Sequence, residues 1–140
     1  MDAFDADVLI YAAVPGHPLG QRVRALFPAE ATATTGAIAG TGSVLLIPEL
    51  LTKPMRDGAE SEVEALVALL GRLELRPVDE AVAQLAAALG AAHGLRAADA
   101  VHLATAVATG ASRFITNNSS DFSKAISEVD VTYPDELPES

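Results

Sequence analysis

The sequence predicts an α/β domain in which a parallel sheet is covered by helices. Short apolar runs of strand type alternate with longer segments of helical periodicity, which is the pattern of consecutive βαβ units. Half of the 140 residues are hydrophobic but only 4% are aromatic, so we expect a core built mainly from aliphatic side chains. A chain of this length can bury a core of its own. We expect one domain over residues 1–133 and a loose tail over 134–140.

The N-terminal part predicts a strand at about 2–5 and a helix from Asp7 to Ala13, although periodicity alone does not decide between strand and helix for the run VLIYAAV. A second helix is predicted by the helical spacing of Leu19, Val23, Leu26 and Phe27, and Pro28 ends it. The small, polar and Gly-rich segment 31–42 is expected to hold one short strand.

Two further helices are expected after this strand. Ser43 is a good N-cap for a helix over VLLIPELL, in which Pro48 would cause a local kink. A turn over 53–58 then leads to the clearest amphipathic helix, at 59–73. Its expected buried residues are Val63, Leu66, Val67 and Leu70.

The C-terminal part continues the alternation. Asp79 is a predicted N-cap for a helix that closes at Gly94, and a further helix spans roughly Ala97 to Thr109 and ends at Gly110. The remaining segments are strands at 73–78, 113–116 and 130–133, with a turn at 117–122.

Four acidic residues stand where an apolar run meets a turn or a helix start: Asp5, Glu49, Asp99 and Asp121. Two carboxylates ~4 Å apart repel by roughly 4 kcal/mol at an effective dielectric constant of about 20. Several together are therefore tolerated only with a cation or with shared protons. Because ligands bind at the carboxyl ends of parallel strands, we expect these acids to meet there as a site for hard divalent cations.

Composition narrows the functional classes. The formal charge of −10 argues against a large electrostatic footprint for nucleic acid, but it does not exclude a nuclease, since a bound divalent cation supplies local positive charge. The absence of Cys excludes disulfides, thiolate metal sites and a Cys nucleophile. No signal peptide or membrane-spanning run is recognised, so a cytoplasmic protein is expected.

The motifs FDADVLIYA, SVLLIPELL, RAADAVHLATA and FITNNSSDF, in this order, resemble those of the PIN-domain nucleases, in particular the toxin ribonucleases of bacterial VapBC toxin-antitoxin pairs. The resemblance covers about residues 2–123. It implies a three-layer α/β/α sandwich, one or two Mg²⁺ or Mn²⁺ ions, and cleavage of single-stranded RNA by in-line attack of an activated water. For a toxin it also implies an antitoxin that places a basic residue among the carboxylates, and a homodimer.

The resemblance implies that Asp5, Glu49 and Asp99 hold the ions and that Asp121 completes the second site. Each acid has a plainer interpretation: Asp5 as a turn residue or N-cap, Glu49 on the solvated side of a helix, Asp99 in a helix first turn, and Asp121 as a turn residue. Asn118 stands where many relatives carry Asp, so Asp121 and Asn118 both remain candidates for the last ligand.

Accessory roles are expected for four residues: Asp7, Thr116, Asn117 and Asn118. Asp7 replaces a small polar residue of the family and either reaches the metal or caps the helix that follows. The other three order the loop or contact substrate phosphate.

The sequence also offers histidines and an arginine near the predicted site. His102 lies one helical turn after Asp99, and we favour a packed, hydrogen-bonded histidine over a metal ligand. Arg96 either contacts phosphate or pairs with an acid such as Asp99. His17 and His93 fall in turns and carry no pattern.

Two alternatives to a nuclease are compatible with parts of the sequence. The pair Asp5 and Asp7 directly after a strand fits a haloacid-dehalogenase-type phosphatase, but Lys53 is misplaced for that chemistry and Lys124 follows the final loop. The second alternative is a PIN-like module that binds a partner without cutting RNA. Metal dependence separates a nuclease from such a module.

Overall fold

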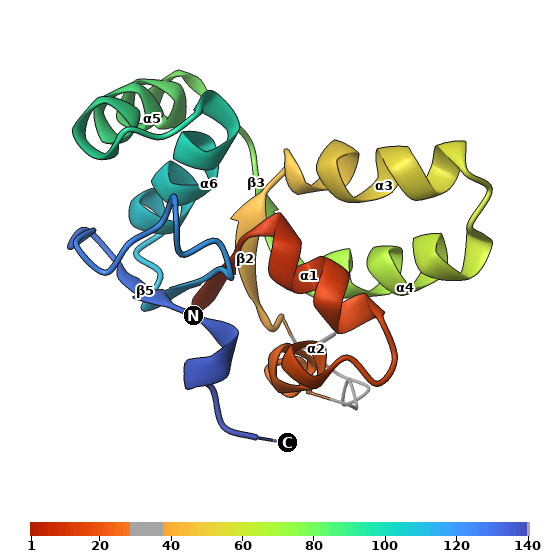
Figure 1. Ribbon diagram of the computed structural model, residues 1–140. Coiled ribbons are helices and arrows are strands. Elements are labelled where there is room, and N and C mark those ends of the chain that lie inside the picture. Colours follow the sequence, from red (N-terminus) through yellow and green to blue (C-terminus); the bar gives the residue numbers. More distant parts are fainter. Residues whose placement is uncertain (29–37, 140) are drawn as a thin grey trace.

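Five parallel strands form the central sheet, in the order β3-β2-β1-β4-β5. The structure is a computed structural model that describes residues 1–28 and 38–139. The strands are β1 (Asp2–Phe4), β2 (Gly40–Ser43), β3 (Leu73–Arg76), β4 (Arg113–Ile115) and β5 (Asp130–Thr132). The parallel sheet with helices on both sides confirms the predicted fold class (Figure 1).

Helices cover both faces of this sheet (Figure 1). The helices packed on one face are α1 (Ala6–Ala13), α2 (Pro18–Arg24), α3 (Leu46–Arg56) and α4 (Glu60–Leu70). The opposite face carries α5 (Glu80–His93) and α6 (Ala97–Ala108). A short 3₁₀ helix at Pro134–Glu136 follows β5.

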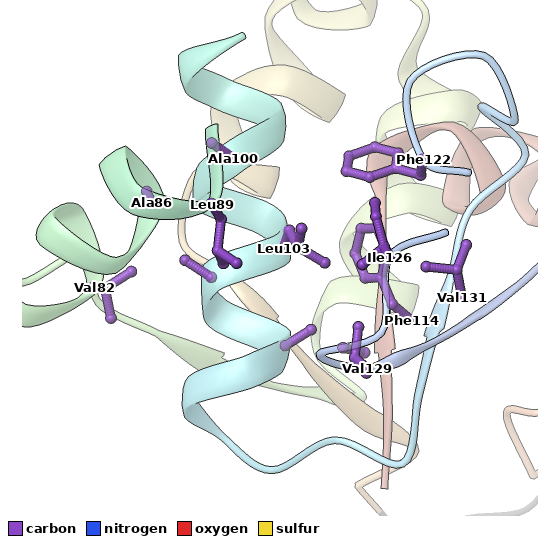
Figure 2. Packing of buried hydrophobic residues seen from close by; sticks show 13 residues of the cluster. Val82, Ala86, Leu89, Ala100, Leu103, Phe114, Phe122, Ile126, Val129 and Val131 are labelled. Carbon is purple, nitrogen blue, oxygen red and sulfur yellow. The ribbon is translucent and has the colours of Figure 1, made fainter. Parts of the chain in front are cut away.

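Two hydrophobic cores lie on the two faces because successive strand residues point in opposite directions. Ala3 and Phe114 belong to the core under α5 and α6, whereas Phe4 and Ile115 belong to the core under α1 to α4. Figure 2 shows the first core, in which Leu103 of α6 faces Phe114 of β4 and Ile126 of the segment after β4. No helix in the described ranges is long and apolar enough to cross a membrane.

Local capping explains several helix ends. The side chain of Asp5 accepts the backbone N–H of Ala6 at 2.8 Å, so α1 begins one residue before the predicted Asp7. Asp79 caps α5 as predicted, with its Oδ1 2.8 Å from the backbone nitrogen of Val82. Gly94 ends α5 with a φ of 66°, a left-handed conformation that glycine adopts readily.

The predicted start of α3 is wrong. Ser43 is the last residue of β2 and pairs with Arg76 of β3. Its hydroxyl accepts the backbone N–H of Leu45 at 3.1 Å, but α3 begins only at Leu46, with Leu45 as its N-cap. Pro48 then lies in the first turn of α3, where a missing N–H costs no intrahelical hydrogen bond. The helix continues through Pro54 to Arg56, across the segment predicted to be a turn.

Burial on α4 and in the C-terminal segment differs from the prediction. Val67 was predicted to be buried but is 50% exposed, because α4 buries a narrower stripe that includes Leu66 and Leu70. In the predicted loose tail, Leu137 is 3% exposed and packs into the core under α1 to α4. The strand predicted within 31–42 is found at Gly40–Ser43, and the part of that prediction at 31–37 lies outside the described residues.

Candidate metal centre

The carboxyl ends of β1 and β4 place Asp5 beside the loop that follows β4. The two strands are parallel neighbours, and the backbone N–H of Asp5 donates to the carbonyl of Ile115 at 2.9 Å. The hydroxyl of Thr116 donates to Asp5 Oδ2 at 2.8 Å. Asp5 is only 6% exposed, and this burial raises the pKa of its carboxyl despite the hydrogen bond from Thr116.

Asp7 faces the same loop from the first turn of α1. Its Oδ2 accepts the backbone N–H of Asn117 at 3.1 Å. Its Oδ1 is buried and has no hydrogen-bond partner among the described residues. Burial and the nearby charge of Asp5 raise the pKa of Asp7 to about 7. Because Asp5 is the N-cap of α1, the prediction that Asp7 caps this helix is wrong.

Glu49 reaches the site from α3 and pairs with a histidine of α6. Its Oε1 forms a hydrogen bond with Nε2 of His102. The His102 ring is buried, as expected for a packed histidine, and its Nδ1 has no partner within the part of the chain that the structure describes. Burial lowers the pKa of His102, but the hydrogen bond that its ring N–H donates to Glu49 and the charges of Asp5, Glu49 and Asp99 outweigh this effect and raise the pKa overall.

Asp99 approaches from the first turn of α6 and is half-buried. Burial raises the pKa of its carboxyl first, and the charges of Asp5 and Asp121 raise it further. The folded chain therefore gathers negative charge from α6, the end of β1 and the loop after β4. Carboxyl groups raise one another's pKa in this way when they lie close together.

Asn118 orders the loop that carries Asp121. Its side-chain Nδ2 donates to Asp121 Oδ2 at 2.8 Å, and its Oδ1 accepts the backbone N–H of Asp121 at 3.2 Å. The backbone N–H of Asn118 donates in turn to the hydroxyl of Thr116 at 3.1 Å. Asp121 is exposed. Asn118 and Asp121 thus form one hydrogen-bonded unit, and the choice between them as ligand stays open.

The donor chemistry fits a hard divalent cation, although the side chains do not yet enclose one. Carboxylate oxygens are the ligands that Mg²⁺ and Mn²⁺ prefer, and the buried Oδ1 of Asp7 has no partner within 1–28 and 38–139. No group of three or more His, Asp or Glu side chains in these ranges is placed to hold a metal ion as it stands. Metal binding therefore requires side-chain rotation, most of all at Glu49, whose carboxylate is engaged by His102. The ligand roles of these acids stay predictions.

The contacts of three residues near the acids were not predicted from the sequence. Arg96 is exposed at the N-cap of α6 and forms no ion pair with Asp99 or any other described acid. Tyr11, which sequence reasoning missed, accepts a hydrogen bond from Asn117 at 3.3 Å. His17, in which we saw no pattern, caps α2 and stacks on Tyr11. The spacing of Asp7 and Tyr11, four residues apart on one helix, is the signal that could have found Tyr11.

Solved structures with the same fold include a toxin-antitoxin complex and two complexes with DNA. A toxin-antitoxin complex from Klebsiella pneumoniae matches at 23% identity and a TM-score of 0.71, covering 96% of this chain and 98% of that one. VapBC2 from Rickettsia felis, bound to a DNA fragment from its promoter, matches at 17% identity and 0.66, with 94% and 97% covered. FitAB bound to an IR36 DNA fragment matches at 23% identity and 0.65, with 99% of each chain covered.

The sequence itself identifies the family. No curated protein matches the chain, and the solved structures, at these identities, show a shared fold alone. The family model described as PIN domain matches residues 3–126, which is most of the 140 residues. This match includes Asp5, Glu49, Asp99 and Asp121 and leaves the haloacid-dehalogenase alternative without support. The chain belongs to the PIN domain family.

Proposed function

We propose that this chain is a divalent-metal-dependent endoribonuclease that hydrolyses single-stranded RNA. Nucleases of the PIN domain family generally depend on divalent metal ions. The observation that carries the proposal is the buried Asp7 Oδ1, which has no partner among the described residues, next to Asp5 and Asp99 where the strands end. Burial and mutual repulsion raise the pKa of all three carboxyls. A cation stabilises the ionised form of such carboxyl groups, because it offsets both the cost of desolvation and the repulsion between them.

In the proposed site Asp5, Glu49 and Asp99 hold Mg²⁺ or Mn²⁺, and Asp121 completes or tunes a second position. Asp7 is a further ligand candidate because its Oδ1 is buried without a partner among the described residues. A divalent cation bound at these acids would stabilise negative charge on the phosphodiester and would lower the pKa of a coordinated water.

The remaining residues orient the acids and the substrate. The Thr116 hydroxyl fixes the Asp5 carboxylate, and the backbone N–H of Asn117 fixes Asp7. His102 holds Glu49 at the edge of the site. Arg96, exposed beside Asp99 at the start of α6, supplies a guanidinium for a substrate phosphate.

The fold also supports a role in a toxin-antitoxin pair. The Klebsiella structure is a toxin-antitoxin complex, and VapBC2 is bound to promoter DNA. We propose that this chain is likewise the toxin of a type II toxin-antitoxin pair. It would act in the cytoplasm as a homodimer, and a cognate antitoxin would block it by placing a basic residue among the carboxylates.

Metal binding is the first test of this function. We expect wild-type protein to bind Mn²⁺ in isothermal titration calorimetry and the Asp5→Asn, Asp99→Asn double variant to lose this binding. Both substitutions keep the size of the side chain, and circular dichroism would verify the fold. Glu62→Gln is the matched control, because Glu62 is an exposed acid on α4, a helix that contributes no residue to the proposed site. Its binding should equal that of wild type.

RNA cleavage is the second test. Labelled single-stranded RNA should be cut by wild type and by Glu62→Gln in Mn²⁺, and should stay intact in EDTA or with the double variant. A folded wild type that binds no metal would overturn the nuclease proposal. Metal binding without cleavage of any RNA would instead favour the partner-binding module.

A further inference from the structure

Two aromatic rings stack beside the proposed metal centre. Tyr11 of α1 and His17, the N-cap of α2, have ring centroids 4.5 Å apart and planes inclined by 9°. Both side chains are partly exposed. All four phenylalanines are buried, and the ring of Tyr133 is covered by the ammonium of Lys124, 4.7 Å from its centroid. Tyr11 and His17 are therefore the rings near the acids that a ligand can reach.

Asn117 connects this ring pair directly to the acids. Its backbone N–H donates to Asp7 Oδ2 at 3.1 Å, and its side-chain Nδ2 lies 3.3 Å from the hydroxyl of Tyr11. Asp7 and Tyr11 are four residues apart on α1, so they share one face of the helix and are separated by about 6 Å along its axis. A strand bound with a phosphate at the acids thus passes the ring pair within one nucleotide.

The ring pair is held in place before any ligand binds. Nδ1 of His17 accepts the backbone N–H of Gly20 at 3.1 Å, which fixes the orientation of the imidazole. A Cβ on Gly20 would lie 2.0 Å from the carbonyl oxygen of Tyr11, so the absence of a side chain lets α2 pack directly on α1. Rings fixed in this way lose little conformational entropy when a base stacks on them.

We propose that Tyr11 and His17 form a stacking platform for one base of single-stranded RNA, next to the phosphate bound at the acids. The inference rests on the proposed function. Stacking on aromatic side chains binds any base, because every base has a π face. It also supplies affinity that does not depend on Lys and Arg, which suits a chain with nine basic residues and a net charge of −10.

The test measures KM and kcat for cleavage of single-stranded RNA in Mn²⁺, together with quenching of a 2-aminopurine base in the same RNA. Tyr11→Leu removes the ring and should raise KM about tenfold and abolish the quenching, within the range measured for loss of one stacked base. His17→Asn also removes a ring but keeps a good N-cap for α2, so it should raise KM without loss of fold. Tyr11→Phe keeps the ring and should retain most of the affinity.

Ile10→Ala is the matched control, because Ile10 is an apolar residue of the same helix that is 41% exposed. Its KM should equal that of wild type. A folded Tyr11→Leu variant with wild-type KM and wild-type quenching would overturn the platform and leave the ring pair as a packing contact or a seat for a protein partner.

The proposed function can fail separately, and Mn²⁺ calorimetry on wild type reports that failure. If wild type does not cut RNA, the quenching titration alone decides the platform. Quenching by wild type but not by Tyr11→Leu would support it, and no quenching by wild type would overturn it.

Discussion

Two effects disfavour the ionised form of the Asp7 carboxyl. It is largely removed from solvent, and Asp5 lies close enough to raise its pKa further, so the pKa reaches about 7 from an ordinary value of 3.8. The backbone N–H of Asn117 compensates only one oxygen. In the absence of a cation the folded chain therefore favours the protonated form of Asp7 below about pH 7.

This shift predicts how stability depends on pH. A carboxyl whose pKa is raised on folding stabilises the folded state fully below its unfolded pKa, near 4, and this contribution is lost as the pH rises through the folded pKa of about 7. Asp7→Asn removes the titrating group. At pH 8 in EDTA the variant should be more stable than wild type by on the order of 2–4 kcal/mol, with little difference at pH 4.

Urea unfolding at pH 4 and pH 8 measures both values. Asp57→Asn is the control, because Asp57 is an exposed acid that pairs with Lys53 at 3.2 Å, and it should follow the wild-type pH profile. Asp5 and Asp99 act in the same direction, so some pH dependence should remain in Asp7→Asn. An unchanged profile in Asp7→Asn would contradict the assigned environment of Asp7.

At the scale of elements, the contact between α1 and α2 depends on a single missing side chain. Gly20 lies on α2 where a Cβ would be 2.0 Å from the carbonyl oxygen of Tyr11 and 2.5 Å from its carbonyl carbon. These are backbone atoms, so they cannot move aside by a change of rotamer. The two helices would have to separate to admit even a methyl group.

Gly20→Ala should therefore lower the free energy of unfolding by about 1–3 kcal/mol, the usual cost of overpacking. It should also weaken stacking of a base on the Tyr11–His17 platform, since the spacing of α1 and α2 sets the ring pair. Gly71→Ala at the end of α4 is the control: its φ is −64° and the nearest atom to a Cβ is at an ordinary 3.4 Å. Equal stabilities of the two variants, measured by urea unfolding, would contradict the close approach of α1 and α2.

Elements whose signals are local were predictable from the sequence. Asp79 begins α5 and Gly94 ends it, each through contacts within a few residues. Both helix ends follow general capping rules. Ser43 has the same capping chemistry, and its hydroxyl accepts the backbone N–H of Leu45, but its backbone pairs with Arg76 in the sheet and so belongs to a strand. Its prediction failed because the competing partner lies on another strand, where no local pattern reveals it.

The same distinction applies to the candidate site. Asp5 and the loop from Thr116 could be placed together because both follow strands that end at one edge of a parallel sheet. The pairing of Glu49 with His102 joins residues 53 positions apart on two helices, and it depends on how α3 and α6 pack. Sequence periodicity carries no information on that packing, so the resting position of Glu49 could not be predicted.

At the scale of the whole molecule, the C-terminal segment ties the last part of the chain to the first. Arg22 of α2 donates to the carbonyls of Asp135 at 2.8 Å and Leu137 at 3.1 Å, and it pairs with Glu139 at 3.0 Å. Figure 1 shows this segment leaving the sheet beside α2. Residues 134–139 of the expected loose tail thus have partners in the structure, through backbone carbonyls and one apolar side chain.

Leu137 anchors this segment and gives a measure of its contribution. Its side chain is 3% exposed within the core that contains Phe4 and Val23. Leu137→Ala should lower the free energy of unfolding by about 2–3 kcal/mol, the lower part of the range for buried leucines, because a terminal segment can relax around the cavity. Val67→Ala truncates a side chain that is 50% exposed and should change stability by less than about 0.5 kcal/mol. If urea unfolding gives both variants the wild-type midpoint, the segment after β5 does not stabilise the fold, and its contact with Arg22 is incidental.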